Sequence, residues 1–490
     1  MTRVLSPKSI TAARTASAAS LHTSAVARAK STPPSASAAR PAKPAATPLS
    51  SLLLPSFKGS NSSSSSTSPT RRAASHTAMP TTTSPYSVPR TSAQISEEVS
   101  EAVAGKENVQ RLQRLQRDFR SDTFTMPTDA QLLVSLRASR GDDVYHEDPS
   151  TAALEERIAK MTGKEAALFG ASGTMTNQLV IRTHMKQPPH SVITDHRAHV
   201  HMLEAGGIAM FSQATTHGIT PANGIHLTAE DIEPALQLGT NIHIAPTKLV
   251  CLENTLSGII FPQEEVVRIG ELVHKNDIQL HLDGARMWNV AAAEIERRGL
   301  NPGDEGVRTA VLTELLAPFD SASLCLSKGI GAPIGSAIVG TKEFIERARW
   351  FRKMFGGGVR QSGGVAASAD YALTHHFPRL AGTHVLARRL AAGLESVGCG
   401  IVAPVDTSMV FFDPTPLGLT IGEICDALAA LPNPINLNAN RVVLHHQTSP
   451  EAVDDFIAEV ERLAALVPAE KRAAGAAAGV GASATVKLGY

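Results

Sequence analysis

Two patterns of hydrophobic and polar positions alternate along residues 110–467 of this chain. Stretches with an apolar residue every three or four positions predict helices, as at 264–274. Short apolar runs between such stretches predict β-strands at 166–169, 192–194, 248–252 and 278–283. Strands that alternate with helices predict an α/β fold with a mostly parallel central sheet, whose ligands bind beyond the strand ends.

Cap and turn residues set the limits of several elements. Thr128 and Gln131 have the spacing of a capping box in front of an apolar helical stretch. Gly163 follows another helical stretch and is expected to act as its C-cap. The acidic, turn-rich residues 141–149 predict a loop.

The chain beyond residue 375 predicts a smaller C-terminal α+β domain. Helical patterns at 386–397 and 450–467 flank short apolar runs, one of which is 441–445. The Ala- and Gly-rich residues 468–490 are expected to form a flexible tail. The folded part is therefore divided into a large domain, 111–375, and a small domain, 376–467.

Residues 1–110 have the composition of a disordered segment. Ser, Ala, Thr and Pro dominate, and no acidic residue occurs before Glu97. Because the start of the chain is basic, rich in hydroxyl groups and free of acids, it is typical of a mitochondrial transit peptide followed by a linker. The alternatives are a plain disordered tail of a cytoplasmic protein, or a start at Met79.

Charge and cysteine content narrow the classes of protein. The chain has 490 residues and a formal net charge of +1, with no basic stripe of the kind that binds nucleic acid. None of its apolar runs has the length of a membrane span. None of its four cysteines forms a CxxC pair, which indicates thiols in a reducing compartment.

Lys328 is the first candidate for chemistry. It ends an apolar run, and glycines and a proline separate it from a second short apolar run at 337–339. This pattern predicts a strand, a tight turn and another strand, with the lysine at the strand end facing a cleft. An amine held there can condense with an aldehyde, and pyridoxal 5'-phosphate (PLP) is the usual biological aldehyde. A solvated lysine in a β-turn is the alternative.

Asp283 is the matching candidate, because it ends the strand predicted at 278–283. PLP needs an anion beside its ring nitrogen, and an aspartate at one strand end and a lysine at a later one meet that need. A helix-cap aspartate is the alternative. Gly173 and Thr174, at the start of a predicted helix, would then suit the phosphate, because a helix N-terminus exposes free N–H groups.

His199 and His201 have a spacing that occurs in metal sites. No third ligand cluster or CxxC pair accompanies them in the sequence, so we expect no metal. A flat imidazole stacked on a flat cofactor ring is the functional interpretation of His199, and a packed loop histidine is the alternative.

Taken together, these residues resemble the low-specificity L-threonine aldolases, a PLP-dependent family of fold type I. The resemblance covers 118–467, the whole predicted globular part. Its motifs are RSDT at 120–123, GDDVY at 141–145, GKEAA at 163–167, SGTM at 172–175, EAGG at 204–207, LENT at 252–255, DGAR at 283–286, CLSKG at 325–329 and GGGVRQSG at 356–363.

The resemblance implies an activity, the cleavage of L-threonine and L-allo-threonine to glycine and acetaldehyde. It implies Lys328 as the Schiff-base lysine, Asp283 as the partner of the pyridinium nitrogen and His199 as the residue stacked on the ring. It also assigns Gly173 and Thr174 to the phosphate.

The resemblance further implies groups around the substrate and between subunits. The substrate carboxylate would be bound by Ser121, Arg286 and Arg441. A pocket shared between subunits of a homotetramer would be completed by Lys353, Arg360 and Tyr145, of which Arg360 is also a cofactor ligand.

One position departs from the family pattern. Many bacterial relatives carry a histidine directly after Glu-Asn-Thr, whereas this chain has Leu256. His199 is therefore the better candidate for the proton of the β-hydroxyl, and the preference between threo and erythro substrates stays open. Another PLP lyase or an aminotransferase would use the same Lys328 and Asp283, and a non-enzymatic binding protein is the alternative from a different class.

Overall fold

A computed structural model of the full chain describes residue 97 and residues 105–482. All of them belong to the second of two units, 85–490. The expected transit peptide lies outside the described residues. The predicted disordered segment, 1–110, overlaps a helix, α2, which spans Lys106–Leu115.

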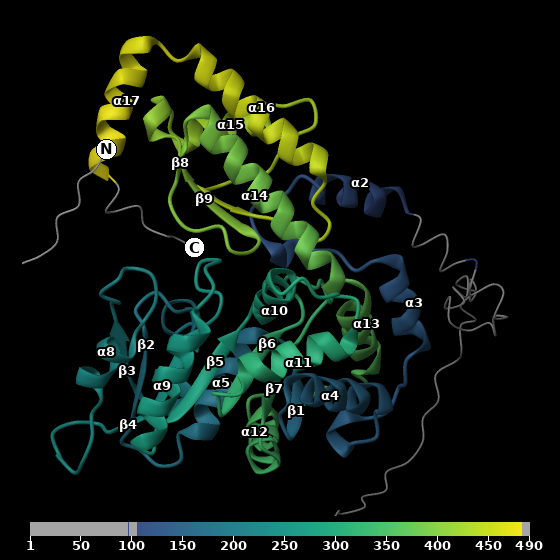
Figure 1. Cartoon of the computed structure of the whole chain (residues 1–490). Helices are drawn as coiled ribbons and strands as arrows, with labels where there is room; N and C mark the ends of the chain where they lie inside the picture. The colour runs from purple at the N-terminus through teal and green to yellow at the C-terminus, as the bar shows by residue number, and fades with distance from the viewer. Residues whose placement is uncertain (1–96, 98–104, 483–490) are drawn as a thin grey trace, which may run out of the picture. The chain divides into compact units, whose positions relative to one another are not determined.

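A seven-stranded sheet forms the centre of the large domain (Figure 1). Its strands follow the order β1 (Ala166–Gly170), β7 (Ser336–Gly340), β6 (Ser321–Cys325), β5 (Gln279–Gly284), β4 (Thr247–Glu253), β2 (Ser191–Asp195) and β3 (Thr215–Ile219). The pairs from β3 to β6 are parallel, whereas β7 runs antiparallel to both β1 and β6. The expected mostly parallel sheet is therefore confirmed.

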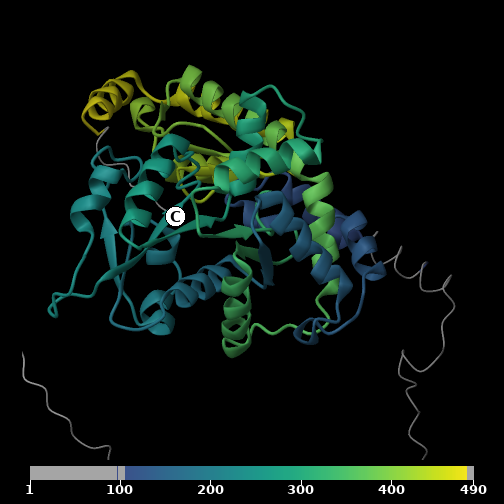
Figure 2. The ribbon, with the colours of Figure 1, turned by 60° about the horizontal axis from the view of Figure 1, so that its bottom comes forward.

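Helices cover both faces of this sheet (Figures 1 and 2). Successive side chains of a strand point to opposite faces of a sheet. In β1, Ala167 and Phe169 belong to one buried cluster and Leu168 belongs to another, so both faces of the sheet are apolar and need cover. The first cluster is completed by α4 (Pro149–Thr162), α9 (Gln263–Lys275), α10 (Met287–Arg297), α11 (Glu305–Leu316) and α13 (Gly363–His375). The opposite face is covered by α5 (Gly173–His184), α7 (Gly207–Ser212) and α12 (Lys342–Met354).

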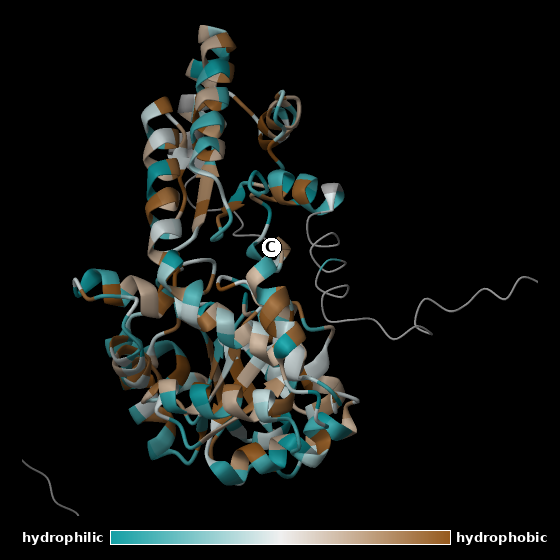
Figure 3. Ribbon diagram, turned by 90° about the vertical axis from the view of Figure 1, so that its right-hand side faces the viewer, coloured by the Kyte–Doolittle hydropathy of each residue, from teal (hydrophilic) through white to brown (hydrophobic). Residues whose placement is uncertain are grey.

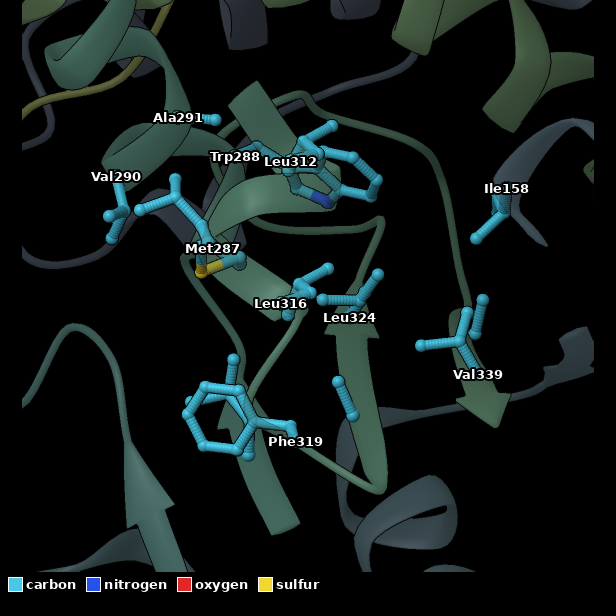
Figure 4. Close-up of a cluster of buried hydrophobic side chains, with 14 of the residues drawn as sticks. Ile158, Met287, Trp288, Val290, Ala291, Leu312, Leu316, Phe319, Leu324 and Val339 are labelled. Atoms are coloured by element: carbon cyan, nitrogen blue, oxygen red, sulfur yellow. The ribbon is translucent and has the colours of Figure 1, made fainter. Parts of the chain in front are cut away.

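The main core lies between the sheet and α10 and α11. Figure 4 shows Trp288 beside Leu312 and above Leu324, which belongs to β6. Trp288 is buried, and its indole N–H donates to the carbonyl of Cys325 at 2.8 Å. This bond fixes the end of β6 from which the chain continues to Lys328.

Most local signals in the sequence are confirmed. The capping box of Thr128 and Gln131 begins α3 (Asp129–Arg137), and Gly163 ends α4 in the left-handed conformation. The pair His199 and His201, whose spacing was compared above with that of metal sites, lies on a short helix, α6 (His199–Met202). Single-turn helices occur at Asp122–Phe124, Asp143–Tyr145, Ala229–Ile232 (α8), Glu233–Ala235, Phe377–Arg379 and Thr415–Leu417.

The small domain is built on an antiparallel sheet of order β10 (Arg441–Val443), β9 (Met409–Asp413) and β8 (Gly400–Ile401). It is packed by α14 (Leu380–Val397), α15 (Ile421–Ala429) and α16 (Pro450–Leu466). Teal and brown segments alternate along the helices of Figure 3, as expected for helices with one buried face.

Phe119 belongs to the core of the small domain, although it lies at the start of the range predicted for the large domain. Its ring contacts Phe456 with centroids 5.7 Å apart, and its carbonyl accepts a hydrogen bond from the N–H of Val443 at 2.8 Å. The small domain therefore contains an N-terminal segment that the sequence analysis placed at the start of the large one.

The predicted flexible tail, 468–490, differs from the structure over most of its length, because helix α17 spans Ala469–Ala482. Alanine is the strongest helix former, and the Ala-rich composition that suggested a loose tail also favours this helix. Within the described residues, no helix combines the length and the hydropathy that crossing a membrane requires.

Residues 326–335, here called the lysine turn, join β6 to β7. Two backbone hydrogen bonds close the turn. The N–H of Leu326 donates to the carbonyl of Gly335 at 3.0 Å, and the N–H of Gly331 donates to the backbone carbonyl of Lys328 at 2.7 Å. Gly335 has φ +112°, and a Cβ added there would lie 2.4 Å from the ring of Phe169. Only glycine fits this position, for reasons of both backbone conformation and space.

Two stacked histidines support the lysine turn from outside. The Nδ1 of His376 lies 2.8 Å from the carbonyl of Ile330, and that of His446 lies 3.3 Å from the carbonyl of Gly329. Their ring centroids are 4.5 Å apart. Burial lowers the pKa of His446 to about 3, so that both rings can pack face to face as neutral groups.

Replacement of Gly335 by alanine should destabilise the protein more than the same change at Gly299. Both positions have positive φ, but nothing lies within 4 Å of a Cβ at Gly299. Backbone strain costs about 1–3 kcal/mol and overpacking adds about 1–3 kcal/mol, so only Gly335→Ala suffers both. Urea unfolding of the two variants measures the difference, and equal losses of stability would contradict the packing described here.

Candidate active site

The candidate site lies at the C-terminal ends of the parallel strands. Asp283 of β5 is the register partner of Glu253 at the end of β4, and β6 leads from the next position in the sheet to Lys328. The N-terminus of α5 lies beside the end of β6, because a Cβ on Gly173 would be 3.4 Å from the sulfur of Cys325. Groups from four segments therefore meet at one edge of the sheet.

Asp283 is a buried carboxylate with both oxygens hydrogen-bonded. Its Oδ2 accepts from the side-chain amide of Asn177 at 2.8 Å, and its Oδ1 accepts from the backbone N–H of Ala285 at 3.1 Å. The whole residue Asp283 is only 2% exposed. Its orientation is therefore fixed by α5 and by the turn that follows β5.

His199 is held beside Asp283 by two other carboxylates. Its Nδ1 lies 2.9 Å from Oε1 of Glu204, and its backbone N–H donates to Oε2 of Glu253 at 2.7 Å. The hydrogen bond to Glu204 raises the pKa of His199, against the effect of burial. The charge of Asp283 also raises this pKa and the charge of Lys328 lowers it, so Asp283 and Lys328 act on the same imidazole.

Arg286 forms a buried ion pair with Asp122. Its Nε and NH2 donate to the two carboxylate oxygens at 3.0 and 2.7 Å. Burial raises the pKa of Asp122, but the charge and hydrogen bonds of Arg286 outweigh it and hold the pKa below its usual value, with help from the charges of Lys328 and His445. The charge of Lys328 therefore acts on Asp122 as well as on His199.

Ser121 and Arg441 lie beside this pair. Ser121 directly precedes Asp122, and its hydroxyl lies 2.9 Å from that of Thr123. Arg441, the first residue of β10, donates from NH2 to the carbonyl of Arg120 at 3.3 Å. The three residues assigned to the substrate carboxylate, Ser121, Arg286 and Arg441, therefore gather around the segment 120–122.

Comparison with known proteins decides the family. The family model described as beta-eliminating lyase matches residues 118–415. A protein named "Probable low-specificity L-threonine aldolase" from Schizosaccharomyces pombe is 46% identical over 337 residues, 69% of this chain and 84% of that protein.

The chain belongs to the beta-eliminating lyase family.

Two further comparisons agree. The low specificity L-threonine aldolase of Saccharomyces cerevisiae is 42% identical over 339 residues, 69% of this chain and 84% of that protein. The solved threonine aldolase of Leishmania major covers 71% of this chain and 99% of its own with a TM-score of 0.58 at 21% identity, which shows a common fold. The resemblance noted in the sequence is thereby confirmed.

The phosphate position expected in this lyase family member is the N-terminus of α5, where Gly173 and Thr174 follow the N-cap Ser172. Thr176 on the next turn lies 2.6 Å from the hydroxyl of Ser323 and 2.9 Å from that of Ser336. These bonds attach the start of α5 to β6 and β7, on either side of the lysine turn. A helix of this length can bind an anion at its N-terminus.

Tyr145, Lys353 and Arg360 form an exposed cluster of their own. Arg360 pairs with Asp142 at 2.9 Å, and its guanidinium lies 5.8 Å from the ring centroid of Tyr145, which is 70% exposed. Lys353 lies close to Gly358 in the same region. The structure therefore groups the three residues that the resemblance assigned to a subunit boundary.

Three buried polar residues were missed as site residues in the sequence analysis: Asn177, Glu204 and Asp122. Asn177 donates to Glu204 at 2.9 Å as well as to Asp283. The signal for Asn177 was a polar run, 176–178, directly before the apolar residues 179–181 of α5. Nothing in the local sequence distinguishes Asp122, whose partner Arg286 is 164 positions away.

The expectation of no metal stays a prediction. The structure brings His199, Glu204 and Asp283 together, with ligand atoms within 4.8 Å of one another, although the sequence showed no third ligand. Their carboxylate oxygens already accept hydrogen bonds from Asn177, His199, Gln178 and Ala285. We therefore describe them as a hydrogen-bonded group.

Asp122→Asn should destabilise this lyase at pH 7 by about 3–5 kcal/mol, because it leaves the buried Arg286 without a counter-charge. The pKa of Asp122 is lower in the folded state than in the unfolded state, so its contribution is present above the ordinary aspartate pKa of about 4 and is lost as the pH falls through the lowered value. Urea unfolding at several pH values should show the difference narrowing on acidification.

The matched control is Asp455→Asn, which removes a half-exposed partner of Arg117. An exposed pair contributes at most about 1 kcal/mol, so this variant should stay close to the wild type. A difference between Asp122→Asn and the wild type that does not change with pH would contradict the ionised pair.

Proposed function

We propose that this chain is a PLP-dependent aldehyde-lyase that cleaves L-threonine and L-allo-threonine to glycine and acetaldehyde. The observation that carries the proposal is that the amide of Asn177 joins the buried carboxylate of Asp283 to the Glu204 that holds His199, while the strand beside β5, β6, leads to Lys328. Relatives at 42–46% identity that are named low-specificity L-threonine aldolases support the substrate and the reaction.

The residues of the site fit PLP. Lys328 would attach the aldehyde carbon covalently, and the buried carboxylate of Asp283 would accept the proton-bearing ring nitrogen. His199 would stack on the ring, while the N–H groups of Gly173 and Thr174 would bind the phosphate at the start of α5. When bound, PLP supplies a conjugated ring that accepts the electron pair left by the broken bond.

The substrate carboxylate would be bound by Arg286, Arg441 and Ser121. Asp122 fixes the plane of the Arg286 guanidinium through two hydrogen bonds, and β10 fixes the position of Arg441. Two arginines from different domains can hold a carboxylate in one orientation. With the carboxylate held, the Cα–Cβ bond of the substrate would lie perpendicular to the plane of the cofactor ring. This orientation selects cleavage of that bond over transfer of the amino group.

His199 is the residue proposed to take the proton of the β-hydroxyl. As the O–H proton leaves, the oxygen forms the carbonyl of acetaldehyde, the Cα–Cβ bond breaks and its electron pair remains on the Cα side. A proton returned to Cα completes glycine. Leu256, which occupies the position of the second histidine of bacterial relatives, is buried and offers no side-chain group for proton transfer.

Lys328→Ala should abolish both threonine cleavage and the visible absorption of the bound cofactor, because no other group of the lysine turn offers a primary amine. Acetaldehyde and glycine are measured without any added amino acceptor, which separates a lyase from an aminotransferase. Lys275→Ala, at the exposed end of α9, is the matched control and should behave as the wild type. Acetaldehyde formation by Lys328→Ala would refute the assignment.

We further propose that a second copy of the chain covers an exposed apolar surface near the site, within a homotetramer. This surface includes Met210 of α7 and Trp350 of α12, which are 77% and 76% exposed. Phe211 of α7 packs on Phe355, the residue directly after α12, with ring centroids 4.5 Å apart. Exposed apolar area of this kind marks protein interfaces.

The proposed role of Arg360 across the interface predicts complementation between two inactive variants. In a hybrid of Lys328→Ala and Arg360→Ala subunits, one site of a two-site pair contains both intact residues. Random pairing should therefore restore about a quarter of the wild-type activity in the unselected mixture, and pairs selected to contain one subunit of each kind should retain about half. Co-expression with two different tags and purification through both measures this recovery.

Purified hybrids that remain inactive would place Arg360 and Lys328 in the same subunit's site. Size-exclusion chromatography of the wild type tests the assembly itself, and a monomer would contradict the covered surface.

A further inference from the structure

Glu204 is a buried ionisable residue to which the proposed function gives no task. Its side chain is 0% exposed, and it lies in the loop between α6 and α7, directly before Ala205 and Gly206, which both have positive φ. Burial of a carboxylate is costly unless the group is hydrogen-bonded and balanced by charge. Its neighbours should therefore reveal why it is there.

Three donors fix the position of the Glu204 carboxylate. Oε1 accepts from the Nδ1 side of His199 at 2.9 Å and from the amide of Asn177 at 2.9 Å, and Oε2 accepts from the amide of Gln178 at 2.6 Å. Asn177 and Gln178 belong to α5, one of the helices packed on the sheet. The carboxylate is thus held by a rigid element and faces the imidazole.

We propose that Glu204 is a positioning residue that keeps the His199 proton on Nδ1 and so directs Nε2 toward the β-hydroxyl of the substrate. The two ring nitrogens of a histidine are distinct, and the hydrogen bond made by one determines the proton state of the other. The proposal rests on the proposed function, because it gives His199 the role of base toward that hydroxyl.

The surroundings of His199 agree with this role. Glu204 faces it from the loop after α6, Asp283 from β5, Lys328 from the lysine turn, and Glu253 from β4 through the backbone N–H. The hydrogen bond to Glu204 is the largest influence that raises the pKa of His199. The charge of Asp283 also raises the pKa of His199. Asp283 and Glu204 both accept a hydrogen bond from the side-chain amide of Asn177.

Glu204→Gln tests the proposal with little change of shape. The Oε1 of Gln178 is buried without a hydrogen-bond partner in the described structure, so a half-turn of its amide provides an acceptor for the new N–H group. The control is Glu459→Gln, which replaces another buried glutamate, on α16 in the small domain. Both variants should retain the bound cofactor.

In Glu204→Gln a neutral amide oxygen, a weaker acceptor than a carboxylate, faces Nδ1 of His199, so kcat should fall by about 10- to 100-fold with KM for threonine nearly unchanged. Glu459→Gln should keep both constants. A purely structural role of Glu204 would lower cofactor content or raise KM, and either of these with kcat unchanged would overturn the proposal.

A second readout needs neither cofactor nor turnover. Diethyl pyrocarbonate modifies neutral imidazole, and peptide mapping by mass spectrometry follows the modification of His199 in the cofactor-free protein as the pH is varied. Because Glu204 raises the pKa of His199, the midpoint should move to lower pH in Glu204→Gln and stay in place in Glu459→Gln. An unchanged midpoint in Glu204→Gln would overturn the proposal.

Glu204→Asp provides an independent check if the glutamine variant does not fold. It keeps the charge but shortens the side chain, so kcat should fall while the midpoint stays closer to that of the wild type; an unchanged kcat would show that the carboxylate does not position His199. Absence of acetaldehyde with the wild-type enzyme would overturn the proposed function instead, and the modification midpoints would still decide the role of Glu204.

Discussion

The side-chain amide of Asn177 holds together two buried carboxylates, those of Glu204 and Asp283. Two like charges removed from water repel each other, and each needs donors to replace its hydration. Asn177 donates one hydrogen bond to each of them, the Nδ1 of His199 lies 2.9 Å from Glu204, and the charge of Lys328 acts on the same imidazole. Without this amide, the group that orients His199 and the group expected to bind the cofactor nitrogen would not lie side by side.

This arrangement depends on α5 being placed accurately on the sheet. The hydroxyl of Thr176, one residue before Asn177, bonds to serines of both β6 and β7, which enclose the lysine turn. The same helix therefore sets three things: the position proposed for the phosphate, the carboxylates, and the strands that carry Lys328. The small domain contributes separately, through Arg441 on one side and through His446 against the lysine turn on the other.

The sequence predicted the residues whose role is visible from their place in an element. Asp283 lies at the end of β5, Lys328 follows β6 in the lysine turn rather than at the strand end itself, and Gly173 begins a helix, so apolar runs and turn residues located them. Asn177 and Asp122 could not be assigned a role, because a hydrogen-bond partner more than a hundred positions away is chosen by tertiary structure.

The features that the sequence did not predict correctly have similar explanations. Strand β3 was not predicted, because its residues Thr215–Ile219 form a partly exposed edge with little apolar pattern. Helix α17 was taken for a loose tail from its composition, although alanine favours a helix. Arg286 was assigned to the substrate alone, and its bond to Asp122 shows that the residue is also part of the interior.

The participation of both ends of the described chain in the site has a consequence for biosynthesis. Arg441 bonds to the carbonyl of Arg120 across a separation of 321 positions, and Phe119 packs against Phe456. A ribosome releases the early segment long before its partners emerge, so Phe119 remains without its native neighbours during most of translation. The large domain can assemble its sheet first. The two arginines proposed to bind the substrate carboxylate, Arg286 and Arg441, come together only when nearly the whole polypeptide has been made.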